Sequence, residues 1–211
     1  MVELPRIYPI VDTTTLDRLS FDPVHAAEAL LDGGARILQF RHKGFWSRDV
    51  FAKAEKIAVL CRSASAAFII NDRADYAMLL RAGLHLGQDD LFPADARKVV
   101  GEKAAVGFST HNAEQMRSAK YEPVDYVAFG PVFGTASKER PDPTVGLEGL
   151  RAIRVLTQRP LVAIGGITQE NAELCWRAGA NSVAVIAGMF PAECTPQSVR
   201  ARIEEWMELC R

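Results

Sequence analysis

The sequence predicts a single α/β domain, residues 1–211, folded as a closed (β/α)8 barrel of the TIM type. First, eight short apolar runs alternate along the chain with eight segments of helical periodicity, and strands separated by crossover helices run parallel. Second, the runs are almost continuously apolar, which is typical of strands buried on both faces. Third, eight such units in about 200 residues suit a closed barrel better than an open, doubly wound sheet, which remains the alternative.

Local signals justify the elements in chain order. Asp22 is the expected N-cap of the first helix, with Pro23 at its first position and Gly33 at its end. Ser47 is the expected cap of the second helix, and Thr168 that of the seventh. The expected strands are residues 6–11, 36–40, 67–70, 84–86, 104–108, 124–129, 161–164 and 182–186. The expected helices are residues 22–31, 47–63, 74–80, 93–100, 113–119, 147–156, 169–178 and 196–209.

Composition excludes several classes of protein. With 25 basic and 26 acidic residues, the chain has no charge excess that would suit a nucleic-acid or membrane surface, so any anion site must be local. No apolar run approaches the roughly 18 residues of a membrane span, and the first residues lack the pattern of a signal peptide. We therefore expect a cytoplasmic protein. The four cysteines are widely spaced and form no CxxC motif that would indicate zinc: Cys61, Cys175, Cys194 and Cys210.

Two apolar runs end in carboxylates. Residues 68–72 read FIIND and residues 84–90 read LHLGQDD, so Asn71, Asp72 and Asp90 follow neighbouring strands. In a barrel the carboxyl ends of all strands meet at one mouth. Mg²⁺ commonly takes one or two carboxylates and fills its shell with water and phosphate oxygens. The sequence thus predicts a magnesium site at Asp72 and Asp90, and the alternative is that each aspartate caps the following helix.

Cations and glycines at other strand ends predict anion binding. Arg41 and Lys43 alternate along an extended segment, so both point the same way, towards a phosphate or into a salt bridge with Asp72 or Asp90. Gly165-Gly166 precedes the helix expected to be capped by Thr168, and Ala187-Gly188 follows the last strand. Phosphate sites recur after the seventh and eighth strands of this fold, although a turn that simply requires glycine is the alternative.

The histidines give weaker signals. His85 lies within an apolar run and is expected to pack in the core between helices. His111 follows Ser109 at a strand end, where it suits acid–base chemistry or simply begins a helix. Neither histidine belongs to a pattern that indicates a hydrolase triad.

Six segments, in this order, resemble the thiamine-phosphate synthase (thiamine-phosphate pyrophosphorylase) family: QFRHK, FIINDR, HLGQDD, GFSTH, DYVAFGPVFGTASK and LVAIGGIT. The resemblance covers nearly the whole chain. It implies a (β/α)8 barrel that joins hydroxymethylpyrimidine pyrophosphate to a thiazole phosphate and releases pyrophosphate with Mg²⁺. It therefore implies phosphorylated small molecules as substrates.

The resemblance also implies roles for residues. Asp72 and Asp90 correspond to the Mg²⁺ ligands. The pyrophosphate and pyrimidine side corresponds to Gln39, Arg41, Lys43, Asn71, Ser109 and Lys138, of which Arg41, Lys43, Ser109 and Lys138 are the catalytic candidates. The thiazole-phosphate side corresponds to Thr135, Ser137, Gly166, Ile186 and Ala187. Two residues depart from the family pattern, because His42 replaces a usual Glu and Ala187 a common Ser.

Two other functions stay open. TenI-like thiazole tautomerases share the barrel and the late glycine turns and use a histidine near the position of His111. They tend to lack the aspartate pair and the cations, so Asp72, Asp90, Arg41 and Lys43 favour the synthase. A catalytically silent barrel that binds phosphorylated ligands and regulates is the non-enzymatic alternative. Helices on the outside of barrels often carry dimer contacts, so a homodimer is compatible with the sequence.

Overall fold

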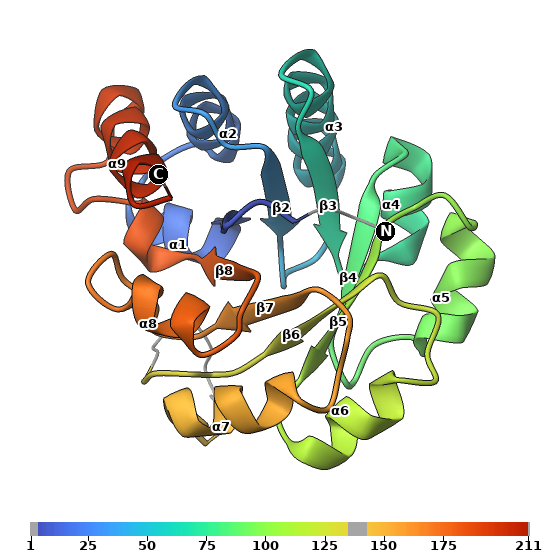
Figure 1. Ribbon diagram of the computed structural model, residues 1–211. Helices are drawn as coiled ribbons and strands as arrows, with labels where there is room; N and C mark the ends of the chain where they lie inside the picture. The colour runs from blue at the N-terminus through green and yellow to red at the C-terminus, as the bar shows by residue number, and fades with distance from the viewer. Residues whose placement is uncertain (1–3, 135–142, 211) are drawn as a thin grey trace.

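The computed structural model describes residues 4–134 and 143–210. In this part of the chain, eight parallel strands follow one another around a closed barrel, and β1 pairs with both β2 and β8 (Figure 1). The helices lie outside the ring of strands. The closed ring confirms the predicted barrel and removes the open sheet as an alternative.

The element bounds agree with the predicted order. The strands are β1 (Ile7–Asp12), β2 (Ile37–Arg41), β3 (Ala67–Asn71), β4 (Gly83–Leu86), β5 (Val106–Thr110), β6 (Tyr126–Phe129), β7 (Leu161–Ile164) and β8 (Ser182–Val185). The helices are α1 (Thr13–Arg18), α2 (Pro23–Asp32), α3 (Arg48–Ser63), α4 (Ala74–Leu80), α5 (Pro93–Val100), α6 (Ala113–Ala119), α7 (Gly146–Arg154), α8 (Ala172–Arg177), the 3-10 helix η1 (Ala187–Met189) and α9 (Pro196–Glu208).

Three local expectations were wrong or incomplete. Helix α1 was not expected from the sequence; it begins after Asp12, whose carboxylate accepts the Thr15 N–H as an N-cap. The 3-10 helix η1 was not expected either. The helix expected to begin after Thr168 begins at Ala172 instead, with Asn171 in the N-cap position and no side-chain cap. The caps at Asp22 and Ser47 are confirmed.

Strand residues alternate between two cores. Side chains such as Leu38, Phe40 and Leu84 point outwards and form the large core beneath the helices. A smaller core fills the inside of the barrel: Tyr8, Ile10, Ile37, Ile69, Tyr126, Ala128, Val162 and Ala184. Because a strand has a period of two, the residues that continue the inner set towards the carboxyl ends must face the mouth.

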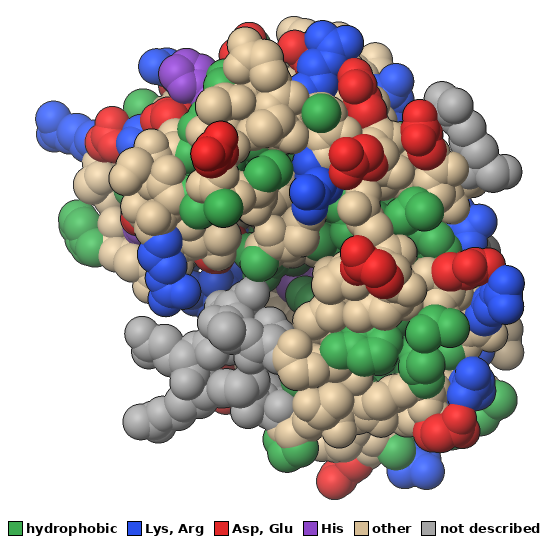
Figure 2. All heavy atoms as spheres, turned by 90° about the vertical axis from the view of Figure 1, so that its left-hand side faces the viewer, with side chains coloured by type: hydrophobic (Ala, Val, Ile, Leu, Met, Phe, Trp, Pro, Cys, Tyr) green, Lys and Arg blue, Asp and Glu red, His purple; other side chains and the backbone are tan. Residues whose placement is uncertain are grey.

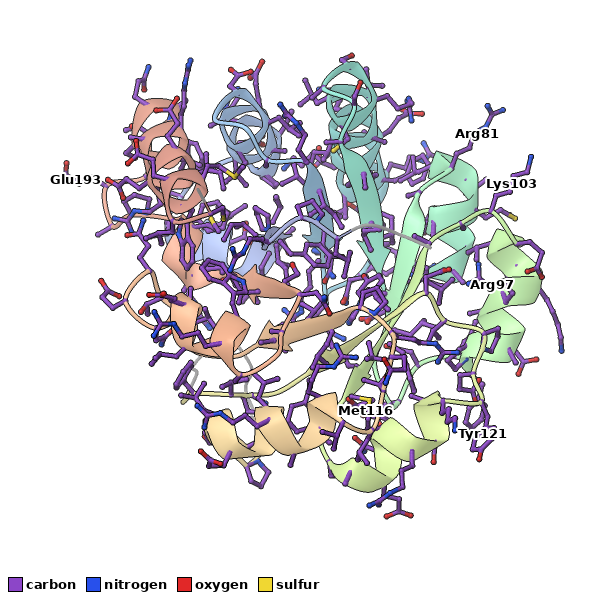
Figure 3. The ribbon with its side chains drawn as sticks, in the orientation of Figure 1. Arg81, Arg97, Lys103, Met116, Tyr121 and Glu193 are labelled. Atoms are coloured by element: carbon purple, nitrogen blue, oxygen red, sulfur yellow. The ribbon has the colours of Figure 1, made fainter. Side chains whose placement is uncertain are left out.

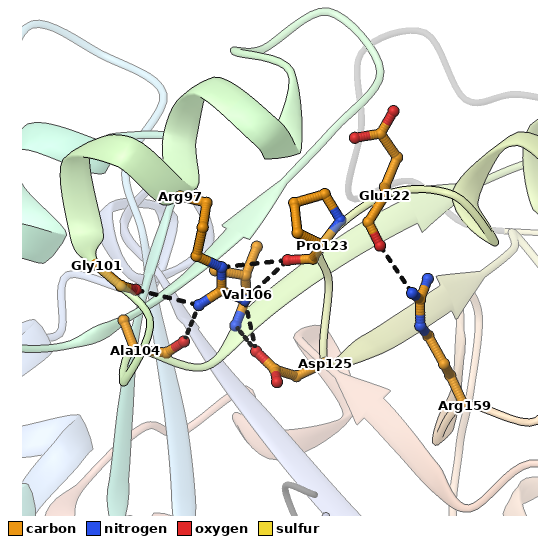
Figure 4. A network of polar contacts seen from close by, with 8 residues as sticks. All are labelled: Arg97, Gly101, Ala104, Val106, Glu122, Pro123, Asp125 and Arg159. Atoms are coloured by element: carbon orange, nitrogen blue, oxygen red, sulfur yellow. Dashed lines mark hydrogen bonds and ion pairs between the residues drawn. The ribbon is translucent and has the colours of Figure 1, made fainter.

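A polar clamp closes the amino-terminal ends of β5 and β6 (Figure 4). The guanidinium of Arg97 donates to the carbonyls of Pro123 and Ala104 and to the Asp125 carboxylate, which also accepts the Val106 N–H. Arg97 is only 9 % exposed, so its charge is satisfied by these groups rather than by solvent. This buried cation therefore supports the loops opposite the mouth.

The outer surface carries side chains of both charges on the face that Figure 2 shows. On the face shown in Figure 2, basic and acidic side chains are interspersed with hydrophobic ones. Arg81 and Lys103 project from the outer edge beside α4 and α5, away from the ring of strands (Figure 3). Within residues 4–134 and 143–210, no helix has the length and apolar character needed to cross a membrane.

Candidate active site

A cavity of about 860 Å³ opens at the carboxyl ends of the strands. The structure brings ten of the residues predicted for the site to its wall: Gln39, Arg41, Lys43, Asn71, Asp72, Asp90, Ser109, Gly166, Ile186 and Ala187. The other three, Thr135, Ser137 and Lys138, lie outside the described residues. A shared wall is the placement that the predicted site requires, and it leaves the roles of these residues as predictions.

The Asp72 carboxylate is presented by a strained turn after β3. Asp72 has a φ of +66°, and the Arg73 N–H donates to the Asn71 carbonyl across it at 2.8 Å, which forms a three-residue γ-turn. Its own N–H donates to the His85 carbonyl at the end of β4. The Asp72 side chain does not cap α4, so the capping alternative is excluded. Strained backbone of this kind persists where the surrounding structure holds it, and it gathers at functional sites.

Charge around Asp72 is only partly balanced. Its Oδ2 accepts from the Lys43 Nζ at 2.5 Å. The pKa of the Asp72 carboxyl is raised to about 6, chiefly because burial removes it from solvent; Lys43 opposes the rise and the neighbouring Asp90 carboxyl adds to it. Asp90 accepts the Gly87 N–H at 2.7 Å, so it holds the turn after β4 rather than capping α5. Two close carboxylates with a single exposed lysine favour an additional cation.

Arg41 has a different partner from the one expected. Its Nη1 pairs with Asp12 Oδ2 rather than with Asp72 or Asp90. Asp12 is only 1 % exposed and also accepts from the Thr15 N–H and hydroxyl at 2.9 and 2.8 Å. The carboxylate therefore fixes the guanidinium at the mouth while α1 is anchored to the same group. The alternative of a salt bridge to Asp72 or Asp90 is therefore confirmed for Lys43, which pairs with Asp72, and wrong for Arg41, which pairs with Asp12.

The donor set suits magnesium better than a softer metal. No group of three or more His, Cys, Asp or Glu side chains that could hold a metal occurs in the described part of the chain. Zinc normally takes four protein ligands, or three and a water, whereas Mg²⁺ needs only one or two carboxylates beside water and phosphate. Asp72, whose carboxyl has a raised pKa, and the neighbouring Asp90 supply the carboxylates that Mg²⁺ needs.

Asn71 offers an unused donor. Its side chain is 6 % exposed, and its Nδ2 is buried without a hydrogen-bond partner among the described residues. A buried amide N–H without an acceptor is unfavourable by about 1–3 kcal/mol, so such groups commonly await a ligand or water. The Asn71 residue lines the cavity, although this Nδ2 atom is not exposed there.

Bare backbone N–H groups line the opposite side of the cavity. Those of Gly166, Ala187 and Gly188 donate to no acceptor in residues 4–134 and 143–210. Gly165 and Gly166 have φ values of +99° and +62°, and a Cβ on either would lie within 2.4 Å of Pro131 or of the Gly134 carbonyl. The turn therefore requires glycine, which was the alternative to phosphate binding given above. It also leaves the Gly166 N–H available as a donor. Adjacent free N–H groups form a concave anion site without a charged side chain.

The position of His85 corrects an expectation. It lies inside the barrel and lines the cavity rather than packing between helices. Its Nε2 and Nδ1 lie 2.9 Å from Ser109 Oγ and 3.1 Å from Tyr126 Oη. His111 also reaches the cavity, and its Nδ1 donates to the Gly130 carbonyl at 2.6 Å.

Comparison with known proteins identifies the family. A family model described as "Thiamine monophosphate synthase" matches residues 7–189. The chain belongs to the thiamine monophosphate synthase family. A thiamine-phosphate synthase of Koribacter versatilis is 46 % identical over 195 residues, which is 90 % of each chain. One of Chloroflexus aurantiacus is 38 % identical over 92 % of this chain and 89 % of its own.

A solved structure supports the same family. The thiamine phosphate pyrophosphorylase of Pyrococcus furiosus superposes with a TM-score of 0.83 at 30 % identity, over 97 % of this chain and 94 % of that one. The superposition spans nearly the whole chain. This member of the thiamine monophosphate synthase family therefore shares its barrel with that structure.

Several residues at the mouth were missed by the sequence analysis. Thr15 and Arg18 reach the cavity from α1, and Tyr8 reaches it from inside β1. Gln88 also lines it and donates to the Ser109 carbonyl at 2.5 Å. One signal was available for α1, since Asp12 before a run of threonines is a common helix start.

Proposed function

We propose that the mouth of the barrel joins hydroxymethylpyrimidine pyrophosphate to thiazole phosphate, giving thiamine phosphate and pyrophosphate. Family membership makes the chain a thiamine-phosphate synthase, a transferase of thiamine biosynthesis. In the reaction the bond from the pyrimidine methylene carbon to the pyrophosphate oxygen breaks, and a bond from that carbon to the thiazole nitrogen forms. The supporting observation is one cavity with carboxylates and cations on one side and bare N–H groups on the other.

Asp72 and Asp90 are the residues that would hold Mg²⁺. When bound, the ion supplies positive charge beside the pyrophosphate that departs. The fit rests on the raised pKa of the Asp72 carboxyl, which marks a place where negative charge is under-compensated. The strained turn at Asp72 keeps this carboxylate in the mouth.

The side chains of β2, β3 and β5 would bind the first substrate. Arg41 is held by Asp12 and offers a planar fork to the pyrophosphate, and Lys43 adds a mobile charge that is half exposed. Gln39, Asn71 and Ser109 offer hydrogen bonds to the pyrimidine. Stabilising the departing charge favours a dissociative substitution, in which the pyrimidine-stabilised cation is captured by the thiazole nitrogen. No protein nucleophile is needed.

The turns after β7 and β8 would bind the second substrate. Gly166 and Ala187 both line the cavity with unused N–H groups that could donate to the thiazole phosphate, and Ile186 lines it as well. Ala187 has no hydroxyl, so only its backbone can donate. Thr135, Ser137 and Lys138 are proposed contributors on the strength of the family pattern alone.

The test is pyrophosphate release by the purified protein with Mg²⁺ and both substrates. Asp72→Asn and Asp90→Asn should each lower turnover by at least a hundredfold. Asp75→Asn is the matched control, because Asp75 pairs with Arg73 on α4 away from the cavity and should leave turnover unchanged. Full activity of both cavity variants would refute the metal assignment.

The same assay separates the other two functions. Isomerisation of a thiazole phosphate carboxylate without pyrophosphate release would indicate a tautomerase. Binding of thiazole phosphate without either reaction would indicate a silent barrel. Location in the cytoplasm, assembly as a homodimer and a single domain over residues 1–211 remain predictions from the sequence.

A further inference from the structure

A continuous chain of hydrogen bonds crosses the inside of the barrel. Its heavy-atom distances are 3.1 Å from Gln39 Nε2 to Tyr8 Oη, 2.9 Å from Tyr8 Oη to Tyr126 Oη, 3.1 Å from Tyr126 Oη to His85 Nδ1 and 2.9 Å from His85 Nε2 to Ser109 Oγ. The first four residues are at most 7 % exposed. The two ends, Gln39 and Ser109, both line the cavity.

The number of hydrogens in this chain is limited. Burial raises the pKa of the Tyr8 phenol and that of Tyr126 well above the ordinary value, so each keeps its single proton. A neutral imidazole carries one N–H, on Nδ1 or on Nε2. Each contact in the chain of hydrogen bonds needs one hydrogen. Whether the Gln39 amide donates to Tyr8 or accepts from it therefore sets the donor and the acceptor in every other bond.

The Gln39 orientation found in the structure gives the first ordering. The Gln39 amide donates to the Tyr8 hydroxyl, so the hydrogen of that hydroxyl needs a different acceptor. Among the described residues the one remaining partner of Tyr8 Oη is Tyr126 Oη, so the Tyr8 hydroxyl must donate to Tyr126. The reverse would leave a buried hydroxyl hydrogen unpaired, at about 1–3 kcal/mol. Tyr126 then donates to His85 Nδ1.

The far end of the chain follows. With Nδ1 of His85 accepting, its proton lies on Nε2 and is donated to Ser109 Oγ. The Ser109 hydroxyl hydrogen is left for the cavity, where it is a donor. At the other end, Gln39 Oε1 has no hydrogen-bond partner among the described residues and is an acceptor for the cavity.

Turning the Gln39 amide over reverses every bond. Its Oε1 would then accept from Tyr8, Tyr8 from Tyr126, and Tyr126 from an Nδ1–H of His85. Nε2 would accept the Ser109 hydroxyl. The cavity would meet the amide as a donor and the hydroxyl as an acceptor.

We propose that this chain of hydrogen bonds couples the polarity of the Gln39 amide to that of the Ser109 hydroxyl. In either ordering the two residues present opposite polarities, one donor and one acceptor. Tyr8, Tyr126 and His85 are positioning residues that transmit the choice. The pairing suits a neutral heterocycle with one donor and one acceptor, such as an aminopyrimidine, and this last assignment rests on the proposed function.

A glycine on β5 makes the arrangement possible. A Cβ at Gly107 would lie 2.1 Å from Cζ and 2.4 Å from Oη of Tyr126. The Tyr126 ring therefore lies against bare backbone, with its ring stacked beside that of His85 at a centroid distance of 5.6 Å. This packing holds the phenol where it reaches both the second tyrosine and the imidazole.

The tautomer of His85 is the direct readout. Nitrogen NMR of the ligand-free, metal-free protein distinguishes Nδ1–H from Nε2–H, and substituting His25, His42 and His111 in turn leaves the His85 signals by elimination. The first ordering predicts Nε2–H in the unmodified protein. A doubly protonated ring at about pH 8 would overturn the proposal, because both nitrogens would then donate.

Gln39→Glu is the decisive variant. An ionised carboxylate can only accept, so Tyr8 must donate to it and the His85 proton should move to Nδ1. The pH is raised to about 9, so that the substituted carboxyl is ionised. Gln39→Met is the matched control: Tyr8 still donates to Tyr126, and Nε2–H is retained.

Breaking the chain should abolish the remote effect. Tyr8→Phe leaves His85 Nδ1 as the acceptor for Tyr126, so Nε2–H is expected with either Gln39 or Gln39→Glu. Persistence of Nε2–H in Gln39→Glu up to about pH 9 with Tyr8 present would overturn the coupling. Reversal in the Tyr8→Phe, Gln39→Glu double variant would do so too. Failure of the proposed reaction would leave all these signals unchanged, so the two ideas fail separately.

Discussion

Asp72→Asn should make the metal-free protein more stable while abolishing its response to magnesium. The Asp72 carboxyl has its pKa raised from 3.8 to about 6 by burial and by Asp90. The folded state therefore disfavours the charged form, and the penalty is fully present above pH 6. It fades as the pH falls from 6 towards 4, because the carboxyl is then neutral in both states.

The magnitude follows from the shift. Since one pKa unit corresponds to about 1.4 kcal/mol, a pKa of about 6 in the folded state implies a penalty of about 3 kcal/mol at pH 7.5 and about 1 kcal/mol at pH 4.5. Asparagine has no charge to desolvate and tolerates a φ of +66° as well as aspartate does. The gain at pH 7.5 already includes loss of the Lys43 pair, because that pair lowers the pKa of Asp72.

Urea unfolding in a chelator at the two pH values is the assay. Asp72→Asn should gain about 3 kcal/mol at pH 7.5, and the gain should shrink about threefold at pH 4.5. Addition of Mg²⁺ should stabilise the unmodified protein and leave the variant unchanged. A variant that is less stable than the unmodified protein at pH 7.5 without metal would refute the electrostatic reasoning.

Three further changes test other parts of the site. Arg41→Met should cost about 3 kcal/mol in urea unfolding, because the buried Asp12 carboxylate loses its cation, and adding Asp12→Asn should recover part of that loss. Gly107→Ala should cost about 1–3 kcal/mol, since the new Cβ overlaps the Tyr126 ring, and an unchanged urea midpoint would contradict this. Ala187→Ser should lower KM for thiazole phosphate by about three- to tenfold with little effect on kcat in steady-state assays, and no change would remove Ala187 from that subsite.

Sequence patterns were sufficient for the barrel and for ten of the residues at its rim. Apolar runs that stop at Arg41, Asn71 and Gly87 located the carboxyl ends of strands, and closure of the sheet brings such ends together whatever lies between them. The helix start at Asp22 was predictable because the cap, the following proline and the periodicity agree.

The direction of side chains within the strands was not predictable. A strand buried on both faces has no polar alternation, so the run around His85 gave no sign of which face was inside. The correct assignment depends on the pairing of β4 with β5, which opposes His85 to Gly107. Ion-pair partners were not predictable either, because they can be far apart in the sequence: Arg41 and Asp12 are 29 positions apart.

The two sides of the mouth differ in their charge: one carries carboxylates, and the other, among the described residues, carries only backbone donors. At Asp72 a strained turn holds a carboxylate with a raised pKa beside a second carboxylate, and this close pair of charges is unfavourable until a cation arrives. At Gly166 and Ala187 the wall carries only backbone donors, which bind an anion without any opposing charge to hold apart in its absence. A pyrophosphate that must leave suits a site whose charge balance depends on a dissociable ion. A phosphate that stays with the product suits a neutral cradle with a fixed shape. The asymmetry of the mouth thus matches a reaction in which one anionic group departs and the other is retained.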